Sequence, residues 1–327
     1  MQVMCSAQET LSLLTQSEIT KQEHMKNQLI TTALLTALTA TAAYGQADDW
    51  KARAVSPVTN PLFFEDPHIR TEVRPIFAYH NIGSDLLDSL GLKGAGGGNV
   101  RVYAMQARFA VTDRLAIIAT KDGYTDVDFD NLPSISKGGW NDLAAGLKYA
   151  FIQDPEKDLI VTGGVKLELP TGNERVFQGN GSGEWDLFVS GAKGYGNFRT
   201  VGSVGWRIPN SFDDESSIAH YSLQLEYRTC SWFIPFISAN GITVVAAGNQ
   251  STLADTGVGI QGWKVEGFDL LNFGADSSDG FTQVVGGVGF RSQLCRWADF
   301  GFAYETSLTT PKALFDDRFT VDFVIRF

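Results

Sequence analysis

The C-terminal residues alternate between large apolar and polar side chains. In the segment 316–327, DDRFTVDFVIRF, every second residue from Phe319 onward is large and apolar, and the residues between them are polar except Val324. Successive side chains of a β-strand point to opposite faces of a sheet, so the segment predicts a strand with one apolar and one polar face. The alternation continues to the last residue, which places Phe323 and Phe327 on the apolar face.

The same period of two recurs along the chain after residue 70. The clearest case is AHYSLQLEYR, residues 219–228, in which Tyr221, Leu223 and Leu225 alternate with polar residues. Further strands are predicted at 101–111, 142–151, 160–169, 184–191 and 299–305, and weaker ones near 71–80, 115–122, 198–208, 231–242 and 281–294. We therefore expect about twelve strands of roughly ten residues, a length that crosses a bilayer when the strand is tilted.

The connections between these strands alternate in length. Short ones are predicted at 112–114, 153–158, 195–198, 229–232 and 293–297, and longer ones at 82–98, 123–139, 170–183, 209–217, 244–280 and 307–317. Tight turns on one side and longer loops on the other are typical of outer-membrane barrels. The fold expected for 71–327 is an all-β, transmembrane, antiparallel up-and-down β-barrel with short periplasmic turns and longer extracellular loops.

Residues before the barrel predict export. The segment 25–45 has Lys26, then an apolar, threonine-rich run, then small residues, which is the layout of a cleaved signal peptide; a transmembrane helix is the alternative. Residues 1–24 are polar and unpatterned, and we interpret them as a non-native or untranslated leader, with Met25 as the expected start. Because the rest of the chain has no such apolar run, we expect that if it enters a membrane it does so as strands, and the expected location is the outer membrane.

The segment 46–70 is long for a lead-in to the first strand. Pro57, Pro61 and Pro67 keep it out of a sheet interior, yet Leu62-Phe63-Phe64 is a compact apolar cluster. We expect either a plug that enters the lumen or a disordered periplasmic tail.

Charge and motifs exclude several kinds of function. Lys plus Arg number 26 against 37 Asp plus Glu, a net charge of -11, which argues against nucleic acid as a partner. Asp126, Asp128 and Asp130 resemble the start of a calcium loop, but Asn131 and Lys137 stand where an EF-hand needs glycine and glutamate. An acidic loop tip or adventitious cation binding remains, and we expect no metal site and no cofactor.

Three stretches resemble one family: GGWNDLAAGLKYAF at 138–151, GGVKLELPTGNE at 163–174 and GSGEWDLFVSGAKGYG at 181–196. They are similar to the outer-membrane transporters named for the phenol-degradation (MetA) pathway, distant relatives of the long-chain fatty-acid channels. The likeness covers roughly 140–209, and Trp140-Asn141-Asp142 departs from the commoner Gly-Asp form of the first motif. It implies a channel for small hydrophobic or aromatic compounds.

The candidate site residues are those on the polar face of the predicted strands. Those expected to line the channel are Arg74, Arg108, Lys148, Lys166, Glu168, Glu184, Asp186, His220, Glu226, Arg228, Arg291 and Glu305. They form either a salt-bridged filling or a lining that selects solutes by charge and size. Both remain open because a twelve-stranded barrel is intermediate in width between small barrels filled by side chains and large barrels with an open channel. Phe323 and Phe327 resemble the sorting signal of outer-membrane barrels, which implies the barrel-assembly machinery and outer-membrane lipid as partners, beside a small-molecule solute.

The functional hypothesis is passive uptake of small, hydrophobic or aromatic solutes, without enzymatic activity. A structural or adhesive barrel is the alternative. A third candidate is an enzyme, because His220-Tyr221-Ser222 resembles the His-x-Ser spacing of outer-membrane phospholipase. The alternation of the predicted strand at 219–228, however, points both His220 and Ser222 into the lumen rather than toward lipid. Cys230 and Cys295 lie in tight turns, where a disulfide forms only if the turns lean together. The sequence leaves the oligomeric state open.

Overall fold

The structure is a computed structural model that describes residues 51, 53–84, 94, 96–131, 137–250, 252–253, 258–259, 262–310, 312 and 314–327. The leader and the signal peptide predicted within 1–45 lie outside these residues. The chain divides into two units, residues 1–47 with Phe327 and residues 48–326, and the second unit is described below.

Strands dominate the described part of the chain. They are β1 (Glu72–Ile82), β2 (Gly98–Ala110), β3 (Leu115–Lys121), β4 (Tyr124–Phe129), β5 (Gly138–Trp140), β6 (Leu143–Asp154), β7 (Leu159–Leu169), β8 (Glu184–Tyr195), β9 (Phe198–Pro209), β10 (Ser217–Tyr227), β11 (Ile234–Ala246), β12 (Thr252–Leu253), β13 (Val258–Gly259), β14 (Thr282–Cys295), β15 (Ala298–Ser307) and β16 (Asp317–Arg326). A 3-10 turn, Glu174–Val176, lies between β7 and β8. Among the described residues, no helix is long and apolar enough to cross a membrane.

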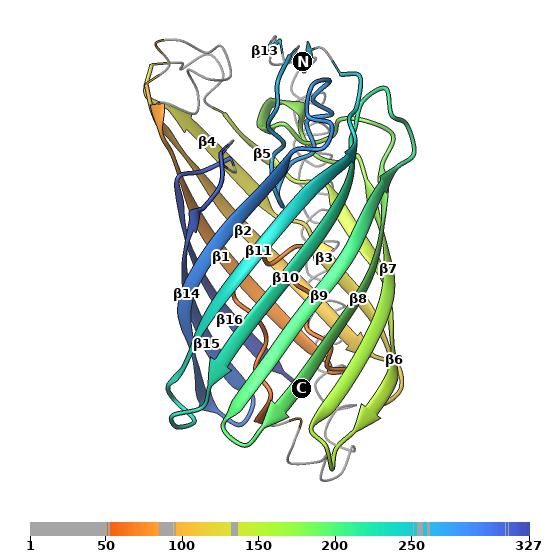
Figure 1. Cartoon of the computed structure of the whole chain (residues 1–327), viewed down its shortest axis with the longest axis vertical. Coiled ribbons are helices and arrows are strands. Elements are labelled where there is room, and N and C mark those ends of the chain that lie inside the picture. Colours follow the sequence, from red (N-terminus) through yellow and green to blue (C-terminus); the bar gives the residue numbers. More distant parts are fainter. Residues whose placement is uncertain are drawn as a thin grey trace, which may run out of the picture. The chain divides into compact units, whose positions relative to one another are not determined.

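The strands close into an antiparallel barrel (Figure 1). Neighbours in the ring follow the order β1-β2-β3-β6-β7-β8-β9-β10-β11-β14-β15-β16, and β16 pairs back with β1 from Glu72↔Arg326 to Asn81↔Asp317. The β16–β1 pairing closes the twelve-stranded ring and so removes the open edges that its first and last strands would otherwise expose to lipid. The prediction of an all-β, up-and-down transmembrane barrel of about twelve strands is therefore confirmed, with the short turns at one end and the longer loops at the other.

The predicted loop 123–139 is wrong in part, because β4 and β5 extend the wall there. Tyr124 pairs with Trp140 and Thr125 with Gly139. In β4 the buried side chains are Thr125, Val127 and Phe129, while Asp126 and Asp128 on the other parity are more exposed. Apolar-in and polar-out is the pattern of a strand whose outer face meets water. The prediction of an acidic loop tip at Asp126 and Asp128 is therefore wrong, because both residues belong to β4.

The wall is interrupted between β3 and β4, where Asp122 and Gly123 replace a regular ladder. Gly123 has φ 106°, and a Cβ there would lie 2.1 Å from the Tyr103 carbonyl oxygen, so only glycine fits. The Asp122 carboxylate accepts from Met105 N at 2.8 Å, and Asn141 N donates to Gly123 O at 2.8 Å. Asn141 of the Trp-Asn-Asp sequence thus supports the break.

The outer and inner faces of the barrel wall have different surroundings. On β10, Leu223 and Leu225 are exposed by 48% and 45%, whereas Gln224 between them is 1% exposed. Phe323 on β16 is likewise exposed and contacts the Phe300 ring. The outer face is thus an apolar surface suited to lipid, and the inner face is polar and buried.

Candidate functional site: the filled lumen

The barrel interior holds residues 53–70, here called the lumenal segment (Figure 1, orange). Both of its ends lie at the tight-turn end. The Arg53 carbonyl accepts from Arg228, which follows β10, and the Arg70 guanidinium donates to Ala54 O at 3.0 Å. Between them the chain enters the barrel, reverses in a turn that begins at Asn60, which has φ 49°, and returns.

Glu65 anchors the returning limb of the lumenal segment. Arg108 on β2 donates to both of its carboxylate oxygens, at 2.8 and 2.7 Å. Lys148 on β6 donates to Glu65 at 2.8 Å and to the Asp66 carbonyl at 2.7 Å. All of these side chains are buried, so Glu65 is shared by two wall cations that would otherwise be costly to bury, and Glu72, 3.6 Å from Arg108, supplies a second negative charge.

Two further wall arginines hold the rising limb through its backbone. Arg74 on β1 donates to Pro57 O at 2.7 Å, and Arg291 on β14 donates to Ser56 O at 2.8 Å. Both guanidiniums are paired with Asp322 on β16, Arg74 Nε at 2.6 Å. Each guanidinium has N–H groups that its ion pair does not use, and these donate to carbonyl oxygens of the lumenal segment.

The opposite end of the barrel is filled by residues 262–275 of the connection between β11 and β14, here called the inward loop. Its apolar side chains Trp263, Val265, Leu270, Leu271 and Phe273 are buried in one cluster with Val100, Val102, Val127 and Phe129 of the wall. Asp269 accepts from Arg318 Nη1 on β16 at 2.8 Å, and Arg318 also binds Glu305 on β15 at 2.8 Å.

Glu266 organises the inward loop from within. Its carboxylate accepts from Ser216 Oγ at 2.7 Å, Phe273 N at 2.7 Å and Ala275 N at 2.9 Å. Burial raises the pKa of Glu266 although these donors oppose the shift. Asn272 extends the network, because its side-chain oxygen accepts from Ser216 N at 2.9 Å. The inward loop is therefore attached to the β9–β10 connection as well as to the wall.

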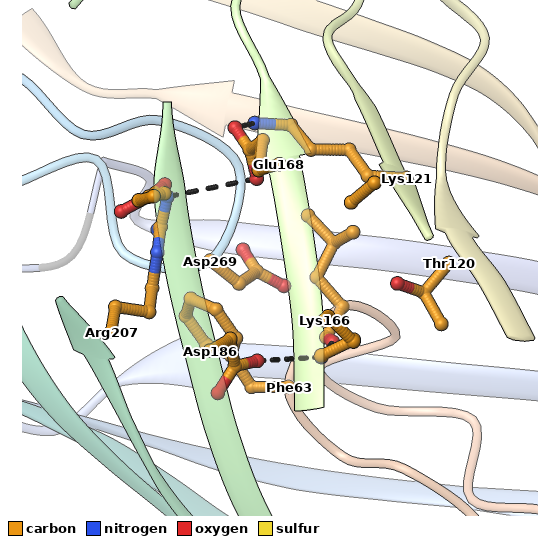
Figure 2. A pocket seen from close by; sticks show the side chains of 11 residues that line it. Phe63, Thr120, Lys121, Lys166, Glu168, Asp186, Arg207 and Asp269 are labelled. Atoms are coloured by element: carbon orange, nitrogen blue, oxygen red, sulfur yellow. Dashed lines mark hydrogen bonds and ion pairs between the residues drawn. The ribbon is translucent and has the colours of Figure 1, made fainter. Parts of the chain in front are cut away.

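The two fillings meet near the longer-loop ends of β3, β7, β8 and β9, around a small cavity (Figure 2). It measures about 20 Å³, close to the space for one water molecule. Its lining is Leu62, Phe63, Thr120, Lys121, Ala144, Lys166, Glu168, Glu184, Asp186, Arg207 and Asp269. Phe63 and Phe268 belong to one buried cluster, so the lumenal segment and the inward loop share a core at this level.

Ion pairs surround the cavity. Lys166 binds Asp186 at 2.6 Å, Lys121 binds Glu168, and Arg207 lies 3.8 Å from Glu168 and pairs with Glu184 (Figure 2). The lining therefore carries charge of both signs, with the cations Lys121, Lys166 and Arg207 beside the carboxylates of Glu168, Glu184 and Asp186.

The structure sorts the predicted lining residues into groups. Arg74, Arg108, Lys148 and Arg291 hold the lumenal segment; Lys166, Glu168, Glu184 and Asp186 line the cavity; and His220 bonds Asp186 at 2.9 Å. Glu305 pairs with Arg318, Glu226 accepts from Gln224 at 2.9 Å, and Arg228 lies beyond the end of β10. These side chains are largely buried in a filled interior rather than exposed to an open pore.

Several residues of the site were not predicted from the sequence. Arg207 and Arg318 have the inward parity of strands that were predicted, so the alternation itself could have identified them. Glu65 and Asp269 lie in irregular segments, where no periodicity indicates which way a side chain points.

The residues considered for catalysis, a disulfide or metal binding have the following positions in the structure. His220 and Ser222 face the lumen, where His220 bonds Asp186 and Ser222 Oγ accepts from Asn60 at 3.1 Å. Cys230 and Cys295 are free thiols. Within the described ranges, no group of three or more His, Cys, Asp or Glu side chains is placed to hold a metal ion.

Comparisons with known proteins show the fold. No family model and no curated protein matches this chain. The COG4313 outer membrane channel from Pseudomonas putida F1 is similar, with a TM-score of 0.51 and 14% identity over 84% of this chain and 100% of that chain. The KdgM porin (TM-score 0.39, 9% identity, 77% and 99% coverage) and the translocator domain of autotransporter NalP from Neisseria meningitidis (0.40, 10%, 91% and 98%) are more distant barrels.

Proposed function

We propose that this protein is an outer-membrane channel for passive passage of small, hydrophobic or aromatic solutes, closed in this conformation by the lumenal segment and the inward loop. Export by a cleaved signal peptide and insertion by the barrel-assembly machinery belong to the same proposal. The family suggested by 138–196, the phenol-degradation type of transporter, supports the choice of solute class.

One observation carries the proposal: the lumen is filled by segments of chain that are not part of its wall. An eight-stranded barrel is filled by its own inward side chains, whereas this one encloses additional backbone. Because Glu65 and the carbonyls of Ser56 and Pro57 bind wall cations, withdrawal of the lumenal segment would leave a polar passage lined by Arg74, Arg108, Lys148 and Arg291. The shared fold with a protein described as an outer membrane channel is consistent with this role.

The enzymatic candidate lacks the geometry it needs. A lipid hydrolase requires its nucleophile and base at the lipid face, within hydrogen-bond reach of one another. Here Ser222 is bonded to the lumenal segment and His220 to Asp186, both inside the barrel.

The test compares solute entry into proteoliposomes for four proteins. They are the intact chain, a variant without 48–66, a variant with 264–274 replaced by a short Gly/Ser linker, and a variant with both changes. We expect the largest permeability and single-channel conductance in the double variant, with lower values in each single variant. If the double variant folds, judged by heat-modifiable migration, yet is impermeable, the channel proposal is wrong and a structural or adhesive barrel is favoured.

A further inference from the structure

Phe63, in the turn of the lumenal segment that begins at Asn60, has its ring in a slot of the barrel wall. The ring stacks on the His220 imidazole, with centroids 4.3 Å apart and planes 18° from parallel. Arg207 Cζ lies 5.1 Å and Lys166 Nζ 6.0 Å from the ring centroid. Stacking and cation–π contacts both depend on an aromatic face, so the wall binds this side chain as a ring and not merely as apolar volume.

The residues that form the slot belong to the barrel and not to the lumenal segment. His220 and Ile218 lie on β10, Arg207 on β9, Lys166 on β7 and Ile242 on β11. Ile218 and Ile242 are fully buried in the same cluster as Phe63. Since strand pairing fixes all of them, withdrawal of the lumenal segment would vacate the slot without dismantling it.

The charges around the slot are already balanced. Lys166 pairs with Asp186 at 2.6 Å, Asp186 also bonds His220, and Arg207 pairs with Glu184. A charged solute would have to compete with one of these ion pairs, whereas an uncharged ring replaces the Phe63 ring directly. The cavity of about 20 Å³ beside Phe63 has room for one small substituent, with ammonium donors and carboxylate acceptors around it (Figure 2).

We propose that this slot is a binding site for a solute with one uncharged aromatic ring and a small polar substituent, and that Phe63 occupies it in the closed conformation. Solute and Phe63 then compete for one site, so solute binding favours release of the lumenal segment. The inference rests on the proposed channel function for its biological meaning, but ring binding is measured without any transport assay, so either can fail alone.

The first experiment empties the slot with Phe63→Ala in lipid nanodiscs and measures binding by calorimetry. Benzyl alcohol and cyclohexylmethanol are the matched aromatic and saturated probes, and benzoate and benzylammonium test charge. Phe64→Ala is the control, because Phe64 is equally buried but packs among Ile118 and Ile160 in an apolar cluster. We expect benzyl alcohol to bind Phe63→Ala at least tenfold more tightly than the other three probes do, and at least tenfold more tightly than it binds Phe64→Ala. Equal binding of cyclohexylmethanol, or equal binding by the control variant, would mean a plain cavity and overturn the proposal.

The second experiment tests competition in the unaltered protein. Saturating benzyl alcohol should speed hydrogen exchange of the Phe64 amide, which bonds Asn60 O at 2.9 Å, by several-fold, because the released segment loses that bond. Cyclohexylmethanol serves as the control for nonspecific partitioning into lipid. Exchange that is unchanged, or accelerated equally by both alcohols, would overturn the competition.

Discussion

The lumenal segment and the inward loop fill opposite ends of the same barrel, but they are held by different chemistry. The lumenal segment also buries Phe63 and Phe64, but most of its anchors to the wall are polar, because Glu65 and several backbone carbonyls accept from wall cations. The inward loop is bound mainly by burial of large apolar side chains, among them Trp263, Leu271 and Phe273. When a buried ion pair opens, hydration of the freed charges offsets much of the lost interaction energy. Exposure of buried apolar surface to water has no such compensation. The comparison indicates that the lumenal segment is the more easily released of the two.

The largest expected effect is that of Glu65→Ala. It leaves Arg108 and Lys148 buried without their shared carboxylate, a change that costs about 3–5 kcal/mol when a buried ion pair loses one partner. We expect faster hydrogen exchange in 54–66 with the inward loop unchanged. Glu156→Ala, on the exposed β6–β7 turn, is the control and should change neither region. Exchange in 54–66 at the rate of the unaltered protein would show that Glu65 is not the anchor.

Leu271→Ala should affect the other end. Truncating a buried leucine removes apolar contacts and leaves a cavity, which costs about 2–4 kcal/mol. The free energy of local opening measured at the Ala275 amide should fall, while the lumenal segment keeps its protection. Leu308→Ala is the matched control because Leu308 is 63% exposed. Loss of protection in both regions together would mean that the two fillings open as one unit.

Ser216→Ala tests the polar attachment of the inward loop. It removes the hydroxyl that donates to the buried Glu266 carboxylate and accepts from Gly248 N at 2.9 Å. A buried acceptor that loses a donor costs about 1–3 kcal/mol, and the inward loop should open more often by a corresponding factor. Ser211→Ala, in the same connection but more exposed, should have little effect on exchange at Phe273 and Ala275.

The smallest effect concerns pH. Burial raises the pKa of Glu215 from 4.5 to about 7, against the attraction of Arg207, while Glu168 adds to the shift. The folded protein therefore binds this proton between roughly pH 4.5 and 7 more tightly than the unfolded chain does, so the associated stability is present in acid and is lost as pH rises through 7. Opening of the β9–β10 connection should become more frequent from pH 5 to pH 8. In Glu215→Gln, which has no proton to lose, this pH dependence should disappear; if it persists, another group is responsible.

The sequence predicts the wall far better than its contents. Alternation along β10 and β16 identifies which side chains face outward, because lipid on one side imposes a strict period of two. The same rule fails at β4, where the outer surface meets water and the apolar side chains of Val127 and Phe129 turn inward.

The fillings could be anticipated only in part. The cluster Leu62-Phe63-Phe64 in a proline-rich segment indicates burial but names no partner for it. Neither the pairing of Glu65 with Arg108 and Lys148 nor that of Asp269 with Arg318 follows from sequence spacing, since each joins an irregular segment to a distant strand. Such contacts depend on how irregular backbone folds within a closed barrel, which local pattern does not specify.

The most direct measurement compares hydrogen exchange at two amides of the unaltered protein in lipid nanodiscs. Phe64 N, bonded to Asn60 O, reports on the lumenal segment, and Ala275 N, bonded to Glu266, reports on the inward loop. If the lumenal segment is a releasable closure, Phe64 exchanges with a lower opening free energy than Ala275, and both exchange well before the strand amides of β10. Exchange of Phe64 only together with the β10 amides would contradict the account, because the lumenal segment would then be a fixed part of the barrel core.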